Sequence, residues 1–251
     1  MDLPRPFVIR ESDHRIHNPF DGAKLATLGE ALRLPRGASL LDLACGSGEM
    51  LATWARDHGI VGTGVDISTH FLAQATRRAA ELGVSDRVSF HHSDAGSYVA
   101  AEPVDVAACI GATWIGGGLE GTIVHLARSL RPGGLVLVGE PYWLKEPPDA
   151  ATVAACHAKS RDEFSTLIGL IGRLADAGWD LVEMVLANPD GWDRYHGAQW
   201  LTIRRWLDAN PDDELAAAFR DELSQAPLDN VVCREYLRWG VFALMRRSPQ
   251  S

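Results

Sequence analysis

The chain has 251 residues and a formal net charge of −9, and 46% of its residues are hydrophobic. That hydrophobic share is enough for a globular core and exceeds what a disordered chain carries. The acidic balance disfavours nucleic-acid binding, which needs a basic surface to displace counterions, and it disfavours docking on an anionic membrane. We therefore predict a globular protein with neither a nucleic-acid nor a membrane partner.

The sequence carries no obvious targeting or metal-binding pattern. Its first residues contain no long apolar run of the secretory type, and no stretch approaches the ~20 apolar residues of a membrane helix. The four cysteines lie far apart and form no C-x-x-C pair, so neither a zinc site nor a disulfide framework is predicted. We expect a cytoplasmic protein with reduced thiols.

Short apolar strands alternate with amphipathic helices in the first half of the chain. Strands are predicted at 39–44, 60–65, 87–91, 104–110 and 135–138, and helices at 49–58, 69–82 and 119–130. Continuous apolar strands separated by helices indicate a parallel sheet that is covered on both faces. Ligands of such doubly wound sheets bind beyond the carboxyl ends of the strands, so polar residues just after strands are candidates for the site.

After residue 143 the predicted strands and helices no longer alternate regularly. The pattern predicts a helix at 165–177, a strand at 179–186, a turn at 188–191, a helix at 192–207, a further helix opening at 210–213 and a last strand at 237–245. The predicted fold is therefore α/β, with a doubly wound, mostly parallel, seven-stranded sheet and a helical insertion before the last strand.

The most informative stretch is the small-residue loop at 44–48, which follows Asp42 and the first predicted strand. Gly46 and Gly48 can adopt positive φ, and small residues let a ligand approach the backbone closely. The loop departs from the dinucleotide fingerprint, because Leu51 stands where that fingerprint has its third glycine. Taken alone, the loop is equally compatible with a tight turn between a strand and a helix.

Two further acids follow the next two predicted strands. Asp66 stands where an acid can accept hydrogen bonds from a ribose hydroxyl pair, and Asp94 can accept one from an adenine amino group. Neither lysine nor arginine lies in or next to the glycine loop to meet a phosphate. Together with Asp42, these acids predict a site for an adenosine-containing cofactor without a phosphate. Asp66 alone could equally serve the N-terminus of the following helix.

In these motifs the sequence resembles the class I S-adenosylmethionine-dependent methyltransferases. Residues 42–48 are similar to the first motif of that family, D-x-G-x-G-x-G, with Ala44 in place of its first glycine. Residues 65–67 and 93–95 are similar to its second and third motifs, and residues 131–134 to the turn before its fifth strand. The resemblance implies a Rossmann-like fold, S-adenosylmethionine as cofactor and S-adenosylhomocysteine as product.

A closer resemblance, to the bacterial YjhP-type subgroup of methyltransferases, runs along the whole chain. It is carried by residues 14–20, 111–115, 139–143 and 191–195. This similarity strengthens the expected reaction class and implies no particular substrate.

The family resemblance also implies which residues hold the cofactor. The methionine part is expected against the glycine loop, the ribose on the acid after the second strand, the adenine beside the third strand and the sulfonium after the fourth. The implied cofactor-binding residues are Asp42, Ala44, Cys45, Gly46, Gly48, Asp66, Ile67, Asp94, Ala95, Ile110 and Gly111.

Residues for chemistry are sought above the strand ends, because methyl transfer is an in-line displacement and protic acceptors need a base. Glu140 and Tyr142 are expected just after the fifth strand, and His196 has an ordinary pKa suited to general-base work. These three are the predicted catalytic residues. The alternatives are structural: a backbone amide or an arginine as partner of Glu140, aromatic packing for Tyr142, and a surface or hydrogen-bonded position for His196.

Aromatic residues and two histidines are the candidates for substrate contact, as an apolar lid and as an N-terminal arm. The predicted substrate-binding residues are His14, His17, Trp114, Trp143, Trp192 and Tyr195. Core packing of the tryptophans and a surface position for the arm are the alternatives. We predict no metal, because the sequence contains no tight carboxylate cluster.

We therefore predict an S-adenosylmethionine-dependent methyltransferase that acts on a small molecule. Residues 1–36 are expected to form an arm and helix over the cofactor, and residues 37–251 the methyltransferase domain, with 188–230 as a helical insertion on the substrate side. A nicotinamide-dependent dehydrogenase would need a complete glycine fingerprint and a Tyr-Lys pair or metal ligands, which we do not find. A cofactor-binding sensor or scaffold without turnover stays open, as do the acceptor atom and the oligomeric state.

Overall fold

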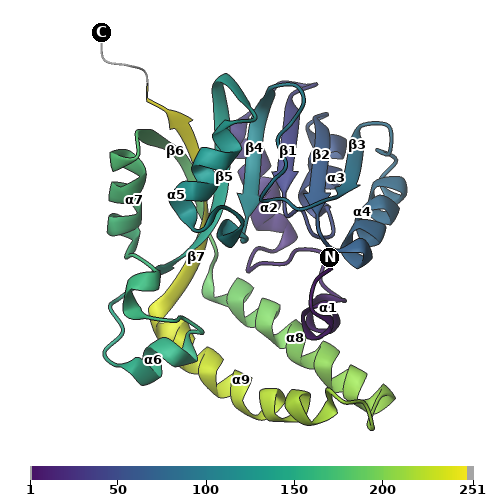
Figure 1. The fold of residues 1–251 in the computed structure, drawn as a ribbon, viewed down its shortest axis with the longest axis vertical. Helices are drawn as coiled ribbons and strands as arrows, with labels where there is room; N and C mark the ends of the chain where they lie inside the picture. Colours follow the sequence, from purple (N-terminus) through teal and green to yellow (C-terminus); the bar gives the residue numbers. More distant parts are fainter. Residues whose placement is uncertain (1, 248–251) are drawn as a thin grey trace.

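The computed structural model describes residues 2–247, and it confirms the predicted α/β architecture (Figure 1). Seven strands form one sheet in the order β3-β2-β1-β4-β5-β7-β6. The strands are β1 (Ser39–Leu43), β2 (Val61–Asp66), β3 (Val88–His92), β4 (Val104–Ile110), β5 (Leu130–Trp143), β6 (Trp179–Leu186) and β7 (Leu237–Arg246). Strand β7 runs antiparallel to both of its neighbours, and the other pairs from β3 to β5 are parallel.

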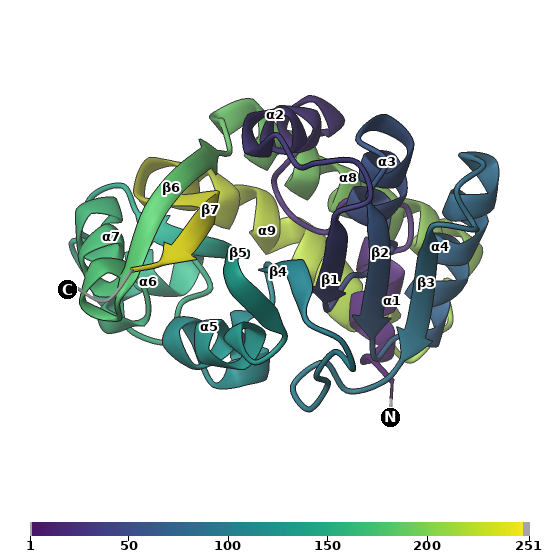
Figure 2. The same ribbon diagram turned by 90° about the horizontal axis from the view of Figure 1, so that it is seen from above.

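Helices cover both faces of this sheet, as its buried apolar strands require. On one face lie α2 (Gly22–Leu32), α3 (Glu49–Asp57) and α4 (Thr69–Glu81), and on the other lie α5 (Leu119–Ala127) and α7 (Leu167–Asp176) (Figure 2). Each face has its own apolar cluster, with Trp54 in the first and Phe242 in the second. The sheet is therefore packed between two layers of helices, and this packing fixes the positions of its strand ends.

Four further helices gather at one end of the sheet. They are α1 (Arg5–Glu11), α6 (Ala150–Ala155), α8 (Pro189–Ala209) and α9 (Ala216–Tyr236), with the two long ones crossing beneath the strands (Figure 1). The Arg10 guanidinium on α1 donates to both Glu222 carboxylate oxygens on α9 at 2.7 Å. The N-terminal segment and the late helices thus form one layer.

The late helices begin elsewhere than predicted. The expected turn at 188–191 is the first turn of α8, because the Asn188 side chain accepts from the Gly191 amide at 2.7 Å and Pro189 occupies the first helical position. The helix expected to open at 210–213 begins at Ala216.

The fifth strand is much longer than predicted, and this changes the position of two candidate residues. It spans 14 residues and includes the expected turn at 131–134. Its partner β7 pairs with it from Leu135 to Trp143, beyond Gly139, where its pairing with β4 ends. Glu140 and Tyr142 therefore lie inside β5, and the expectation that they follow the strand was wrong.

Within residues 2–247, the structure has no helix that is both long and apolar enough to cross a bilayer. The same residues contain no cluster of His, Cys, Asp and Glu that could hold a metal ion.

Candidate active site

A strained turn joins β1 to α3. Ala44, Gly46 and Gly48 adopt φ values of 60°, 54° and 67° in this turn. Left-handed backbone is unfavourable for residues with a Cβ, so glycine suits two of these positions and Ala44 carries strain. The turn therefore follows the carboxyl end of β1 directly, the edge at which ligands of such sheets bind.

Asp66 ties this turn to the end of the neighbouring strand. Its Oδ2 accepts from the Gly46 amide and its Oδ1 from the Ser68 amide, both at 2.8 Å. Asp42 lies one strand away and is almost fully buried. Burial and the nearby Asp66 charge raise the pKa of Asp42 well above its ordinary value. Of the two carboxyl groups, Asp66 is the one with amide donors that stabilise its charge.

His17 lies directly over the turn. Its Nδ1 would lie 2.8 Å from a Cβ added to Gly46, so only glycine leaves room for the imidazole there. Nε2 donates to the His14 carbonyl at 3.2 Å and lies 3.1 Å from Oγ of Ser47, while the ring packs on Phe71 at 4.3 Å. Burial lowers the pKa of His17, which favours a neutral ring.

Two cavities flank His17 at the carboxyl ends of β1, β2, β3 and β4. The first cavity is lined by Arg15, Asp42, Glu49, Met50 and residues 44–47. The second cavity, of about 290 Å³, is lined by Asp66, Ile67, Asp94, Ala95, Phe7 and Phe71. The second cavity is also bordered by His17, Ala44, Gly46, Ile110 and Gly111. The structure therefore brings the predicted cofactor residues, with the exception of Gly48, from four separate strand ends to one cleft.

A third cavity, of about 630 Å³, opens beside the second. The two share Gly111 and Trp114, whose indole is 71% exposed. Glu140 lines the third cavity and accepts from the Thr113 hydroxyl at 2.8 Å. Burial raises the pKa of Glu140 to about 7, although the Thr113 hydrogen bond and the Arg173 charge act against it. A carboxyl group that titrates near neutral pH can both accept and release protons.

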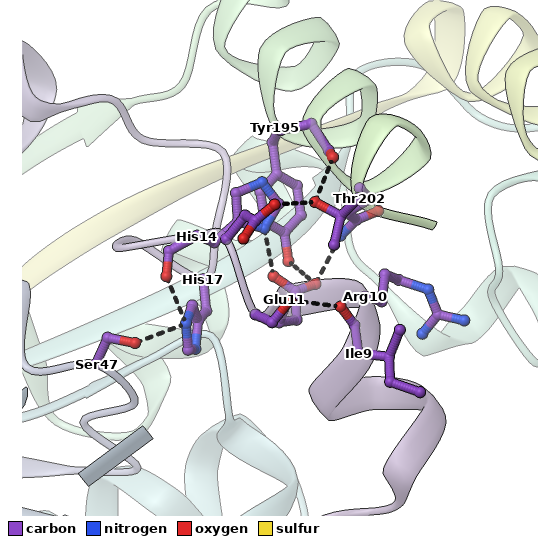
Figure 3. A network of polar contacts seen from close by, with 12 residues as sticks. Ile9, Arg10, Glu11, His14, His17, Ser47, Tyr195 and Thr202 are labelled. Carbon is purple, nitrogen blue, oxygen red and sulfur yellow. Dashed lines mark hydrogen bonds and ion pairs between the residues drawn. The ribbon is translucent and has the colours of Figure 1, made fainter. Parts of the chain in front are cut away.

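A fourth cavity, of about 620 Å³, is lined mainly by residues of α1, α6, α8 and α9. Tyr195, His196 and Gln199 from α8 line it, together with Glu11 from α1. The Glu11 carboxylate is 1% exposed and accepts from His14 Nδ1, Tyr195 Oη and Gln199 Nε2 (Figure 3). Burial alone would raise the pKa of Glu11, but the His14 and Tyr195 contacts lower it below its ordinary value.

Five predicted site residues line none of these four cavities, namely His14, Gly48, Tyr142, Trp143 and Trp192. Tyr142 is buried in the core cluster beneath α7, where burial raises its pKa. Trp143 is buried and donates from Nε1 to the Arg161 carbonyl at 2.8 Å. Trp192 stacks on His196 with ring centroids 5.3 Å apart. Alternation along β5 explains Tyr142 and Trp143, because successive side chains of a long strand enter the cores on opposite faces.

Sequence reasoning missed two residues that the fold brings to the site. Glu11 reads as an ordinary acid at the end of a short helix, and its partners Tyr195 and Gln199 are 184 and 188 positions away. Arg15 lines the first cavity, although the sequence places no cation next to the glycine loop. One sequence feature could have pointed to both residues: they are close in sequence to His14 and His17, in the segment expected to cover the cofactor.

The cleft offers groups that match S-adenosylmethionine. Asp66 and Asp94 provide carboxylates for hydroxyl and amino donors, Ile67 and Phe71 provide apolar walls for a base, and Arg15 provides a cation for a carboxylate.

Comparison with known proteins gives the same result. Residues 40–134 match the family model described as a methyltransferase domain. The chain is 59% identical over 248 residues to YjhP of Escherichia coli (strain K12). The aligned region covers 98% of this chain and 100% of YjhP. A solved S-adenosylmethionine-dependent methyltransferase from Geobacter sulfurreducens, in complex with S-adenosyl-L-homocysteine, is 60% identical with a TM-score of 0.97, covering 98% of this chain and 99% of that one.

The chain belongs to the class I S-adenosylmethionine-dependent methyltransferases. Its cofactor is S-adenosylmethionine, as the family resemblance of the sequence implied. A more distant relative is the dTDP-4-amino-2,3,4,6-tetradeoxy-D-glucose N,N-dimethyltransferase of Saccharopolyspora spinosa, 29% identical over 199 residues, 75% of this chain and 72% of that protein.

Proposed function

We propose that this methyltransferase transfers the methyl group to a small-molecule acceptor bound in the fourth cavity. The observation that carries the proposal is the cavity itself, of about 620 Å³, which borders the cofactor cleft through Phe7. That volume lies within the range of roughly 300–1,000 Å³ typical of small-molecule sites.

The net charge of the chain and the name of a related protein support the same proposal. The net charge of −9 disfavours nucleic acid and anionic membranes as partners. The relative from Saccharopolyspora spinosa is named for methylating an amino sugar, which is a small molecule. We further propose a cytoplasmic setting, since the four cysteines are free thiols.

Different residues of the chain bind the cofactor in the cleft and the acceptor in the fourth cavity. Asp66 holds the ribose hydroxyls, Asp94 the adenine amino group, and the 44–48 turn with Arg15 the methionine part. The cofactor supplies an activated methyl group on a sulfonium centre. Residues 1–36 cover the cofactor and residues 188–230 enclose the acceptor, so both segments exclude water from the reacting atoms.

Label transfer from S-adenosyl-[methyl-³H]methionine tests this proposal. The protein is incubated with the low-molecular-weight, protein and nucleic-acid fractions of a bacterial lysate in separate reactions. We expect label in a small-molecule product and in neither macromolecular fraction. Label in protein or nucleic acid would contradict the proposed substrate class, and tight S-adenosylhomocysteine binding with no labelled product would favour a sensor or scaffold.

A further inference from the structure

The wall of the third cavity contains a carboxyl group that forms no ion pair within residues 2–247. Glu140 lies inside β5 and lines this cavity, and only 9% of the residue is exposed. Its Oε2 accepts from the Thr113 hydroxyl at 2.8 Å. Its Oε1 accepts from no group in the described part of the chain, and this oxygen is not fully buried. One carboxylate oxygen is therefore anchored, and the other is open to the cavity.

The charged groups around Glu140 do not neutralise it. Arg173 on α7 is the cation with the largest effect on Glu140, but its Nε and Nη2 donate to the two Glu120 carboxylate oxygens at 2.7 and 2.8 Å. Glu120 on α5 and Glu163, in the segment before α7, add negative charge. Lys159 also lines the cavity, at an exposed position, and its charge has less effect on Glu140 than these three.

An ionised Glu140 is therefore a buried charge that lacks a counter-ion. Burial raises the pKa of Glu140 to about 7, so ionisation above that pH costs stability. A neutral side chain at this position would avoid the cost. Carboxyl groups perturbed in this way, in a cavity next to a cofactor site, are candidates for ligand binding. A cation bound at Oε1 would supply the missing counter-charge.

The rest of the third cavity suits an organic cation. Trp114, Phe164 and Trp239 line it together with Glu140, and aromatic rings attract ammonium groups that lie over their faces. Its volume of about 630 Å³ is within the range of roughly 300–1,000 Å³ typical of small-molecule sites. A metal ion would need several ligands, and residues 2–247 contain no cluster of His, Cys, Asp and Glu to hold one. The ligand class that fits is an amine with an apolar body.

This cavity lies beside the cofactor cleft and is separate from the proposed acceptor chamber. Thr113, which anchors Glu140, begins the short helix η1 (Thr113–Gly116), and Trp114 of that helix lines both the second and the third cavity. The third and fourth cavities share no lining residue. A ligand in the third cavity can therefore lie next to the cofactor while the methyl acceptor occupies the fourth.

We propose that the third cavity binds an organic ammonium ion, which donates a hydrogen bond to Oε1 of Glu140 and packs its apolar body against the aromatic walls. The site takes a second ligand, distinct from the methyl acceptor, so this inference goes beyond the proposed function. The ammonium pairs with the ionised form of Glu140. Below about pH 7 binding must first displace the Glu140 proton, so the affinity rises with pH.

Calorimetry with three probes of similar shape and different charge tests the site. 2-Phenylethylammonium is the cation, 2-phenylethanol the neutral probe and phenylacetate the anion, and each is titrated into protein saturated with S-adenosylhomocysteine. At about pH 8 we expect the cation to bind, and the other two to bind at least about 10-fold more weakly. Glu140→Gln should raise the dissociation constant of the cation about 10- to 100-fold. Glu146→Gln, on the exposed loop after β5, is the matched control and should bind the cation like the wild type.

The pH dependence is a second readout on the same proteins. With a pKa of about 7, Glu140 is about 90% ionised at pH 8 and about 3% at pH 5.5, so the wild type should bind the cation about 30-fold more weakly at the lower pH. An alkylammonium stays charged at both pH values, and its binding to Glu140→Gln should not change between them.

Three results would each overturn the ammonium site. They are no binding of the cation to the wild type, binding of the alcohol as tight as that of the cation, and binding of the cation that Glu140→Gln leaves unchanged. None of them bears on label transfer to a small molecule, so the proposed function is tested separately.

Discussion

Replacing Glu140 by glutamine should stabilise the protein at alkaline pH and leave its stability unchanged in mild acid. Burial in the wall of the third cavity raises the pKa of Glu140 from an ordinary 4.5 to about 7. Since one pH unit of such a difference corresponds to ~1.4 kcal/mol, the full effect is about 3 kcal/mol.

The sign follows from proton binding. Between pH 4.5 and about 7 the folded state holds the Glu140 proton more tightly than the unfolded state does. Stability therefore falls as the pH rises through this window, and the loss is complete above the folded-state pKa. Glutamine stays neutral and its amide oxygen can still accept from Thr113, so Glu140→Gln avoids the loss.

Urea denaturation of both proteins across the pH range measures the difference in unfolding free energy. At about pH 8 Glu140→Gln should exceed the wild type by about 3 kcal/mol, and near pH 4.5 the two should agree. Glu146→Gln, on the exposed loop after β5, is the matched control and should follow the wild type throughout. A difference that does not change between these pH values would refute the reasoning.

Two predictions concern the turn after β1. Gly48→Ala should lower the unfolding free energy by about 2–5 kcal/mol, because φ is positive and the new Cβ would lie 2.7 Å from the Phe90 ring and 2.8 Å from Ala75. Gly37→Ala, at positive φ in open space, should cost only about 1–2 kcal/mol, and equal losses in a urea titration would contradict this account. Ala44→Gly should raise the unfolding free energy by about 0.5–1 kcal/mol by relieving left-handed strain, whereas a lower Tm would show that the turn is unstrained.

Local patterns were sufficient to predict the sheet and which residues meet in one cleft at its strand ends. Asp66 and Asp94 could be placed because strand ends follow from apolar runs, and the carboxyl ends of parallel strands meet at one edge. The added finding is that the Asp66 carboxylate also accepts from the Gly46 amide. That contact depends on the path of the turn, which the sequence does not specify.

Long-range contacts explain what could not be predicted. The Glu11 network needs α1 and α8 side by side, and no local pattern links positions so far apart. Similarly, β5 extends to Trp143 because β7, far along the chain, pairs with it there. Both cases concern pairing partners rather than local propensity.

Calorimetric binding of S-adenosylhomocysteine to the wild type and to Asp66→Asn tests the central claim, that the cofactor lies between the glycine turn and the ends of β2 and β3. We predict tight binding to the wild type, a dissociation constant about 10- to 100-fold higher for Asp66→Asn, and no heat with NAD. Asp86→Asn, at an exposed position before β3, is the matched control and should bind like the wild type. Equal affinity of Asp66→Asn and the wild type, or binding of NAD in place of S-adenosylhomocysteine, would contradict the location of the site and the residue roles assigned from it.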